Sequence, residues 1–154
     1  MTSHSSHQRT ALFAGSFNPF TTGHLRIVER GLHIADRVVV AVGYNEHKYA
    51  GDIDSRVEAL RRVFKSRPEV EVTSYSGLTA NFARSVGADF LLRGVRGNAD
   101  FEYERNLADI NLNVLGMDTV ILVSEPQYAY ISSSAVRELR ANGYDVTPFL
   151  PSLQ

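Results

Sequence analysis

The stretch from residue 10 to residue 28, TALFAGSFNPFTTGHLRIV, constrains the fold of this chain more than any other. Residues 12–14 form a short continuous apolar run, which is typical of a strand that is buried on both faces of a sheet. After a polar turn, apolar residues recur at helical spacing from residue 25 onward. The stretch therefore predicts a strand, a short turn and a helix that begins near His24.

The turn in this stretch has the features of a phosphate-binding site. Free backbone N–H groups and the positive end of the helix dipole gather at a helix N-terminus, where His24 would lie. Gly15 and Gly23 have no Cβ that would keep a ligand from the main chain. The alternative is a plain strand-to-helix turn in which the glycines satisfy backbone geometry and the histidine caps the helix.

Four further strands are predicted at residues 37–43, 70–75, 90–92 and 119–123, separated by helix-length segments. Strands that alternate with helices in this way form parallel sheets. The predicted fold class is therefore α/β, with a doubly wound, five-stranded parallel sheet and right-handed crossovers.

Capping signals and helical spacing mark the helices that follow these strands. They predict a helix begun by the capping-box pair Ser55 and Glu58, a helix with Leu78, Phe82 and Val86, and a helix with Val136 and Leu139 that ends at Gly143. The segment 101–115 carries two apolar stripes, more than one sheet face covers. This segment is either a central core helix or a helix that also packs against another subunit.

Composition indicates a soluble globular protein, with 44% hydrophobic and 21% charged residues. A length of 154 residues suits one domain, so we expect a flexible N-terminal tail at 1–9 and a single domain at 10–154. No apolar stretch approaches a membrane span, and the absence of cysteine fits a cytoplasmic protein. The net charge of −1 gives no indication of nucleic-acid binding.

Several hydrogen-bond donors follow the predicted strands at the edge where parallel α/β sheets bind ligands. They are His24, Lys48 in the loop 44–52, the pair Arg93 and Arg96, and the hydroxyls of Ser132, Ser133 and Ser134. Arginine forks, a lysine charge and serines before a helix all suit phosphate oxygens. This donor set predicts a triphosphate site, although the three serines could simply cap a helix.

Other chemistries lack the residues that they require. The GxGxxG, GxxxxGK[ST] and GxSxG patterns are missing, and His24, His33 and His47 do not have the spacing of a zinc site. Direct phosphoryl-type transfer needs mainly alignment and charge stabilisation, which the donor set can supply.

Five separate motifs resemble one family of nucleotidyltransferases. They are GSFNPFTTGH, the lysine loop, SGLTANFAR at 76–84, RGVRGNADFEYE at 93–104 and ISSSAVR at 131–137. The first resembles the T/HxGH signature of the nucleotidyltransferase superfamily. RGxR followed by DFEYE is similar to phosphopantetheine adenylyltransferases in particular. The resemblance implies a Rossmann-like nucleotidyltransferase fold and the transfer of an adenylyl group from ATP to 4′-phosphopantetheine, giving dephospho-coenzyme A and pyrophosphate.

The resemblance also implies roles for individual residues. His24 would stabilise the transition state, with Lys48 and Arg93 as further catalytic residues, and Ser16, Lys48, Thr79 and Arg93 would bind the acceptor. The residues that would bind ATP are Ser16, Phe17, His24, Gly94, Val95, Arg96, Glu104, Tyr128, Ala129, Tyr130, Ile131, Ser132, Ser133 and Ser134. Magnesium would arrive with ATP, coenzyme A is a candidate feedback ligand, and such enzymes usually assemble as homohexamers.

The chain departs from the family pattern at four positions of these motifs. Ser16 replaces a threonine, Asn18 an aspartate, Thr79 an aliphatic residue and Tyr128 a tryptophan. Two alternative functions stay open. One is a sister enzyme that acts on nicotinamide mononucleotide or on a sugar or glycerol phosphate, and the other is a non-catalytic nucleotide-binding module.

Overall fold

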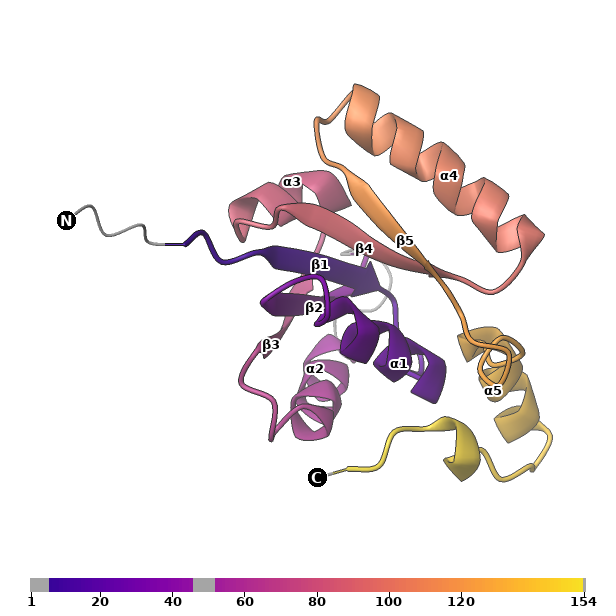
Figure 1. Cartoon of the computed structure of the whole chain (residues 1–154). Helices are drawn as coiled ribbons and strands as arrows, with labels where there is room; N and C mark the ends of the chain where they lie inside the picture. Colours follow the sequence, from indigo (N-terminus) through magenta and orange to yellow (C-terminus); the bar gives the residue numbers. More distant parts are fainter. Residues whose placement is uncertain (1–5, 46–51, 154) are drawn as a thin grey trace.

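The computed structural model describes residues 6–45 and 52–153. Its elements alternate between strand and helix along the whole chain (Figure 1). They are β1 (Thr10–Gly15), α1 (Thr22–Gly31), β2 (Arg37–Gly43), α2 (Ile53–Val63), β3 (Val70–Tyr75), α3 (Thr79–Ser85), β4 (Phe90–Val95), α4 (Asn98–Asn113), β5 (Thr119–Val123), α5 (Ser133–Ala141) and the 3₁₀ helix η1 (Thr147–Phe149).

The five strands form one parallel sheet in the order β3-β2-β1-β4-β5. Helices α1 and α2 pack on one face of this sheet, whereas α3 and α4 lie on the other (Figure 1). The strand order reverses between β1 and β4, which makes this a doubly wound fold as predicted. In such folds ligands bind at the carboxyl ends of the strands, at the point of reversal.

The central strands supply the core. Val38 to Val42 of β2 are fully buried, because helices cover both faces of the sheet at this point. Alternate residues of β1 therefore enter different apolar clusters: Phe13 packs with α1 and α2, whereas Leu12 packs with α3. The continuous apolar runs that predicted β1, β2 and β5 are confirmed as strands, and the residue bounds of β2 and β5 agree with the prediction.

Three local predictions are wrong. Helix α2 begins at Ile53, and Ser55 does not cap it, because the Ser55 hydroxyl donates to the backbone carbonyl and the carboxylate of Asp52. Leu78 precedes α3 and is 58% exposed, while Ala80 and Ala83 form the buried side of that helix. Strand β4 continues beyond residue 92 to Val95, because ladder pairing with β5 extends that far.

Helix α4 is oriented differently from an ordinary core helix. Its only buried residue is Glu104, and the half-buried Ala108 and Asn111 lie on the same side. The apolar residues Phe101 and Ile110 are 48% and 54% exposed. The interpretation of this segment as a central core helix is therefore wrong for the single chain.

The N-terminal segment makes contacts before β1 begins. The ring of His7 lies 2.6 Å from the carboxylate of Asp89, and the backbone N–H of Arg9 donates to Asp36. Two residues of the predicted tail, His7 and Arg9, therefore contact the domain. Among the described helices, none is long and apolar enough to cross a membrane.

Candidate active site

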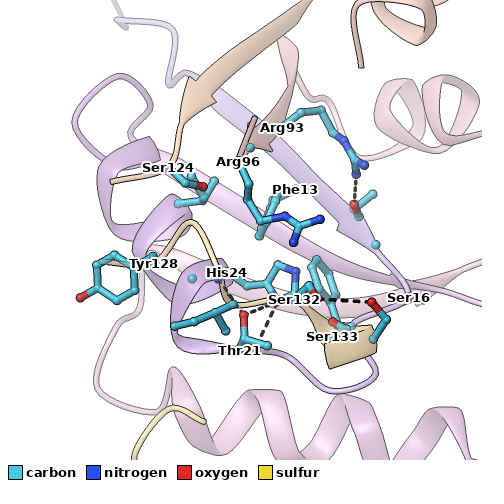
Figure 2. Close-up of a pocket in the computed structure, with 18 of the residues that line it drawn as sticks. Phe13, Ser16, Thr21, His24, Arg93, Arg96, Ser124, Tyr128, Ser132 and Ser133 are labelled. Atoms are coloured by element: carbon cyan, nitrogen blue, oxygen red, sulfur yellow. Dashed lines mark hydrogen bonds between the residues drawn. The ribbon is translucent and has the colours of Figure 1, made fainter. Parts of the chain in front are cut away.

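A cavity of about 400 Å³ opens at the carboxyl ends of β1 and β4, where the strand order reverses (Figure 2). It lies between the first turn of α1, the end of β4 and the start of α5. Its lining includes Gly15, Ser16, Phe17, Gly23, His24, Arg93, Gly94, Arg96, Tyr128, Ile131, Ser132, Ser133, Ser134 and Arg137. The structure therefore brings together segments that are more than 100 residues apart in the sequence.

The first turn of α1 fixes the orientation of His24. Thr21 is the fully buried N-cap, and its Oγ1 accepts a hydrogen bond from the backbone N–H of His24 at 3.3 Å. In return, the backbone N–H of Thr21 donates to Nδ1 of His24 at 2.9 Å. Because Nδ1 accepts this hydrogen bond, the neutral ring carries its proton on Nε2. His24 both caps the helix and lines the cavity.

His24 is uncharged at neutral pH. Burial lowers the pKa of its imidazole to about 4, and the charges of Arg93 and Arg96 add to this effect. The rings of Phe17 and Phe20 lie 5.1 and 5.3 Å from the imidazole and supply part of its apolar surroundings. The cavity thus contains a neutral N–H donor of fixed direction.

The turn between β1 and α1 is held by side chains from two other helices. Arg56 of α2 donates to the carbonyl of Ser16 at 2.8 Å, and Arg137 of α5 donates to the carbonyl of Asn18. The hydroxyl of Ser133 donates to the carbonyl of Pro19 at 2.7 Å. Phe17 has a positive φ of 45°, which few residues other than glycine adopt. These contacts fix Ser16 at the floor of the cavity.

The three arginines of the cavity differ in charge compensation. Arg93 is paired with Glu104, and Arg96 is paired with Asp100 at 2.9 Å. Within the described parts of the chain, no carboxylate pairs with Arg137. Arg137 is therefore the guanidinium whose charge is most available to an anionic ligand.

The N-terminus of α5 contributes hydroxyls to the opposite wall. Ser132 is the N-cap, and its Oγ accepts from the backbone N–H of Ala135 at 3.1 Å. Ser133 holds the turn at Pro19, and Ser134 is exposed in the cavity. The interpretation as a helix cap is therefore confirmed for Ser132, whereas binding of an oxyanion by Ser134 stays a prediction.

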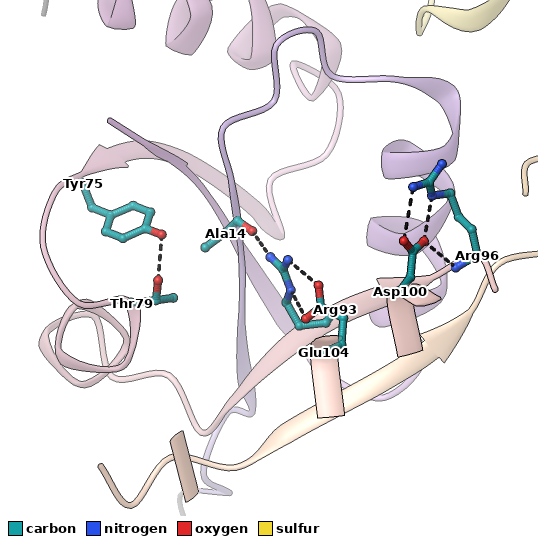
Figure 3. Close-up of polar contacts among 7 residues, drawn as sticks. All are labelled: Ala14, Tyr75, Thr79, Arg93, Arg96, Asp100 and Glu104. Carbon is teal, nitrogen blue, oxygen red and sulfur yellow. Dashed lines mark hydrogen bonds and ion pairs between the residues drawn. The ribbon is translucent and has the colours of Figure 1, made fainter. Parts of the chain in front are cut away.

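A second cavity of about 250 Å³ adjoins the first. The two cavities share Ala14, Gly15, Ser16 and Arg93 in their lining. The second extends between β4, α3 and α4, and it contains Thr79, whose hydroxyl forms a 2.8 Å hydrogen bond with that of Tyr75 (Figure 3). The site therefore has two compartments that meet beside Ser16 and Arg93.

Most of the residues predicted from the sequence lie at these cavities, with a few exceptions. Val95 is buried in β4, and Ala129 and Tyr130 do not line the first cavity. Glu104 lines the second cavity instead of the first. Lys48 and His47 lie outside the described residues.

Two arginines of the site, Arg56 and Arg137, were not predicted from the sequence as functional candidates. Arg137 ends the ISSSAVR motif. It lies three residues after Ser134 on the same predicted helix, and residues three apart lie on one face of a helix, so this spacing could have placed Arg137 near the serines. Arg56 had no such signal, because it lies on a helix with no chemical motif and reaches the turn only through the fold.

The donor set fits an anion better than a resident metal. Among the described residues, no group of three or more His, Cys, Asp or Glu side chains is placed to hold a metal ion. The carboxylates of Glu104 and Asp100 are paired with Arg93 and Arg96, which line the cavity. A magnesium ion would therefore fit this site as part of a metal–triphosphate substrate.

Solved structures share this fold. A bifunctional NMN adenylyltransferase/ADP ribose pyrophosphatase from Francisella tularensis superposes with a TM-score of 0.65 at 14% identity, covering 95% of this chain and 46% of that one. The chain thus spans about half the length of that protein. A putative nicotinate-nucleotide adenylyltransferase from Vibrio parahaemolyticus gives a TM-score of 0.64 at 17% identity, with 95% of both chains covered.

Comparisons of the amino-acid sequence identify the protein family more closely than the fold does. A profile of the cytidylyltransferase-like family matches residues 12–139, so the fold and cavity are those of a nucleotidyltransferase class. A phosphopantetheine adenylyltransferase from Porphyromonas gingivalis is 52% identical over 92% of this chain and 93% of its own length. The corresponding protein of Phocaeicola vulgatus is 46% identical over 93% and 95%. The chain belongs to the phosphopantetheine adenylyltransferase family.

Proposed function

We propose that this protein transfers the adenylyl group of ATP to 4′-phosphopantetheine, giving dephospho-coenzyme A and pyrophosphate. The observation that carries the proposal is the pair of cavities that meet beside Ser16 and Arg93. The first has the donors for a triphosphate, and the second is a separate compartment for the acceptor chain. An acceptor phosphate at Arg93 would then lie next to the α-phosphate of ATP. The relatives at 52% and 46% identity carry the name of this activity.

The reaction needs no covalent intermediate. An oxygen of the acceptor phosphate attacks the α-phosphorus, a new P–O bond forms, and the bond to the β-phosphate breaks to release pyrophosphate. His24 would donate from Nε2 to an α-phosphate oxygen as charge develops there. Arg96, Arg137 and the N-terminus of α5 would hold the departing pyrophosphate. Magnesium, bound to the triphosphate, supplies further charge neutralisation.

Arg93 and Lys48 are assigned to the phosphate of the acceptor. For Arg93 the support is its place between the two cavities, and for Lys48 it is the family pattern. Thr79 would contact the acceptor chain in the second cavity, where its hydroxyl is paired with Tyr75.

The decisive measurement is coupled pyrophosphate release. We expect turnover only when MgATP and 4′-phosphopantetheine are both present. Turnover with nicotinamide mononucleotide or a sugar or glycerol phosphate, and none with phosphopantetheine, would assign the chain to a sister reaction. Tight ATP binding without pyrophosphate release from any acceptor would identify a nucleotide-binding module.

The same proposal includes a homo-oligomer, specifically a hexamer. Its support is the exposed apolar surface of α4, formed by Phe101, Ile110, Leu112 and Val114. The second cavity lies between this helix and the sheet, and these four residues do not line that cavity, so they stay exposed in the single chain. Contact with other copies of the chain would bury them.

A further inference from the structure

Glu104 is the one buried residue of α4, and it lies between Arg93 and the second cavity. It is 6% exposed, and both of its carboxylate oxygens accept hydrogen bonds from Arg93 (Figure 3). Oε2 receives the Nε–H of Arg93 at 2.8 Å, and Oε1 receives an Nη2–H at 2.7 Å. Such a two-point contact fixes the plane of the guanidinium as well as its position.

The opposite side of the same guanidinium is also held. Nη1 of Arg93 donates to the carbonyl of Ala14, at the end of β1 next to the turn with Ser16. Three of the five N–H groups of Arg93 are thus engaged by Glu104 and Ala14 within the described structure. Two N–H groups, one on each Nη, are left for a ligand. Arg93 lines both cavities, so these donors can reach the junction between them.

We propose that Glu104 is a positioning residue for the acceptor phosphate, acting through Arg93. The proposal rests on the function proposed above. Two observations support it: Glu104 lines the second cavity and not the first, and both of its carboxylate oxygens accept hydrogen bonds from Arg93. Glu104 also keeps the guanidinium charged, because burial lowers the pKa of Arg93 but the hydrogen bonds and the charge of Glu104 raise it above its ordinary value.

The test uses Glu104→Gln in the full-length chain. The amide keeps the size of the side chain, but its NH₂ group faces the Arg93 fork and releases one anchoring point. Misplacement of a binding group by about 1 Å can cost up to a hundredfold, so we expect KM for phosphopantetheine to rise about tenfold or more. We expect the KM for ATP to rise less than the KM for phosphopantetheine, because Arg93 is assigned to the acceptor phosphate.

A binding measurement separates positioning from general structural damage. Calorimetry gives the dissociation constants of phosphopantetheine and of pantetheine, which lacks the phosphate. The dissociation constant of phosphopantetheine divided by that of pantetheine should rise about tenfold in Glu104→Gln, because only the phosphate contact weakens. In an Arg93→Ala background, Glu104→Gln should cause no further change in this ratio. If Glu104→Gln does not fold, the shorter Glu104→Asp gives the same comparison.

Two variants of the same helix serve as controls. Glu102→Gln removes an exposed carboxylate from α4 and should leave both KM values unchanged. Asp100→Asn removes the partner of Arg96 and should affect the ATP side instead. A KM for ATP that rises as much as the KM for phosphopantetheine with Glu104→Gln, or an unchanged binding ratio, would overturn the proposal. A wild-type protein that releases no pyrophosphate would overturn the proposed reaction, while the binding ratio would still test the role of Glu104.

Discussion

At the scale of single residues, His24 uses its two ring nitrogens for different tasks. Nδ1 closes the N-terminus of α1 by accepting from Thr21, which leaves Nε2 to carry the proton. The capping contact therefore fixes the tautomer of the His24 imidazole that lines the cavity. A neutral donor stabilises growing negative charge without binding the ground-state triphosphate as strongly as a cation would.

Removal of this donor should affect the transition state more than substrate binding. We expect His24→Ala to lower kcat by about a hundredfold or more while KM for ATP changes little, as for the loss of one oxyanion-hole donor. The control is His33→Ala, which removes an exposed histidine after α1 and should keep full activity. Steady-state kinetics decide the matter, and a rise in KM with unchanged kcat would make His24 a binding residue only.

The pH dependence of His24 follows from its low pKa. Because burial and the two arginines lower this pKa to about 4, we expect no inflection of kcat from His24 between about pH 5 and 8. An unfolded histidine titrates near 6.5, so the stability contributed by neutral His24 is fully present above that pH and is lost as pH falls through about 4. NMR titration of the imidazole in the free protein measures this, and a pKa near 6.5 would contradict it.

At this scale the sequence predicted residue types better than residue partners. The GSFNPFTTGH and ISSSAVR motifs indicated His24 and the serines, since a helix start is visible in local spacing. The pairing of Arg93 with Glu104 was not predicted, because 11 positions and a bend of the chain separate them and only the fold brings them together.

At the scale of elements, the three serines at the start of α5 have different positions and contacts. Ser132 caps the helix, Ser133 holds the turn before α1, and Ser134 faces the cavity. Strands such as β2 and β5 were predictable from continuous apolar runs. The start of α2 was not, because Ser55 has the right spacing for a cap and yet donates back to Asp52 inside the first turn.

These differences predict different effects for the substitution of Ser132 and of Ser134. Ser132→Ala removes the N-cap and should destabilise the protein by about 1 kcal/mol. Ser134→Ala should leave stability unchanged and raise KM for ATP about fivefold, the effect of one lost neutral hydrogen bond. Denaturant unfolding and initial-rate kinetics on the pair measure both effects, and equal loss of stability in the two variants would contradict the assignment.

At the scale of the whole molecule, the reversal of strand order organises both cavities and the outer surface. The second cavity occupies the space between α4 and the sheet, so this helix turns Glu104, Ala108 and Asn111 inward. Apart from Leu107, which also lines this cavity, its large apolar residues face outward, beside the half-buried strand β5 and its exposed Val123. Two apolar stripes were visible in the sequence, but the cavity that leaves them uncovered was not.

Assembly through α4 follows from this arrangement. Light scattering at micromolar concentration should give the mass of six chains for the wild type. Ile110→Lys places a charge on the exposed apolar surface of α4 and should shift the protein to smaller species, because an unpaired charge is costly inside an apolar interface. Ile34→Lys, at an exposed apolar position after α1, is the matched control and should leave the mass unchanged. A monomeric wild type would refute the assembly, and an unchanged mass with Ile110→Lys would place the interface elsewhere on the chain.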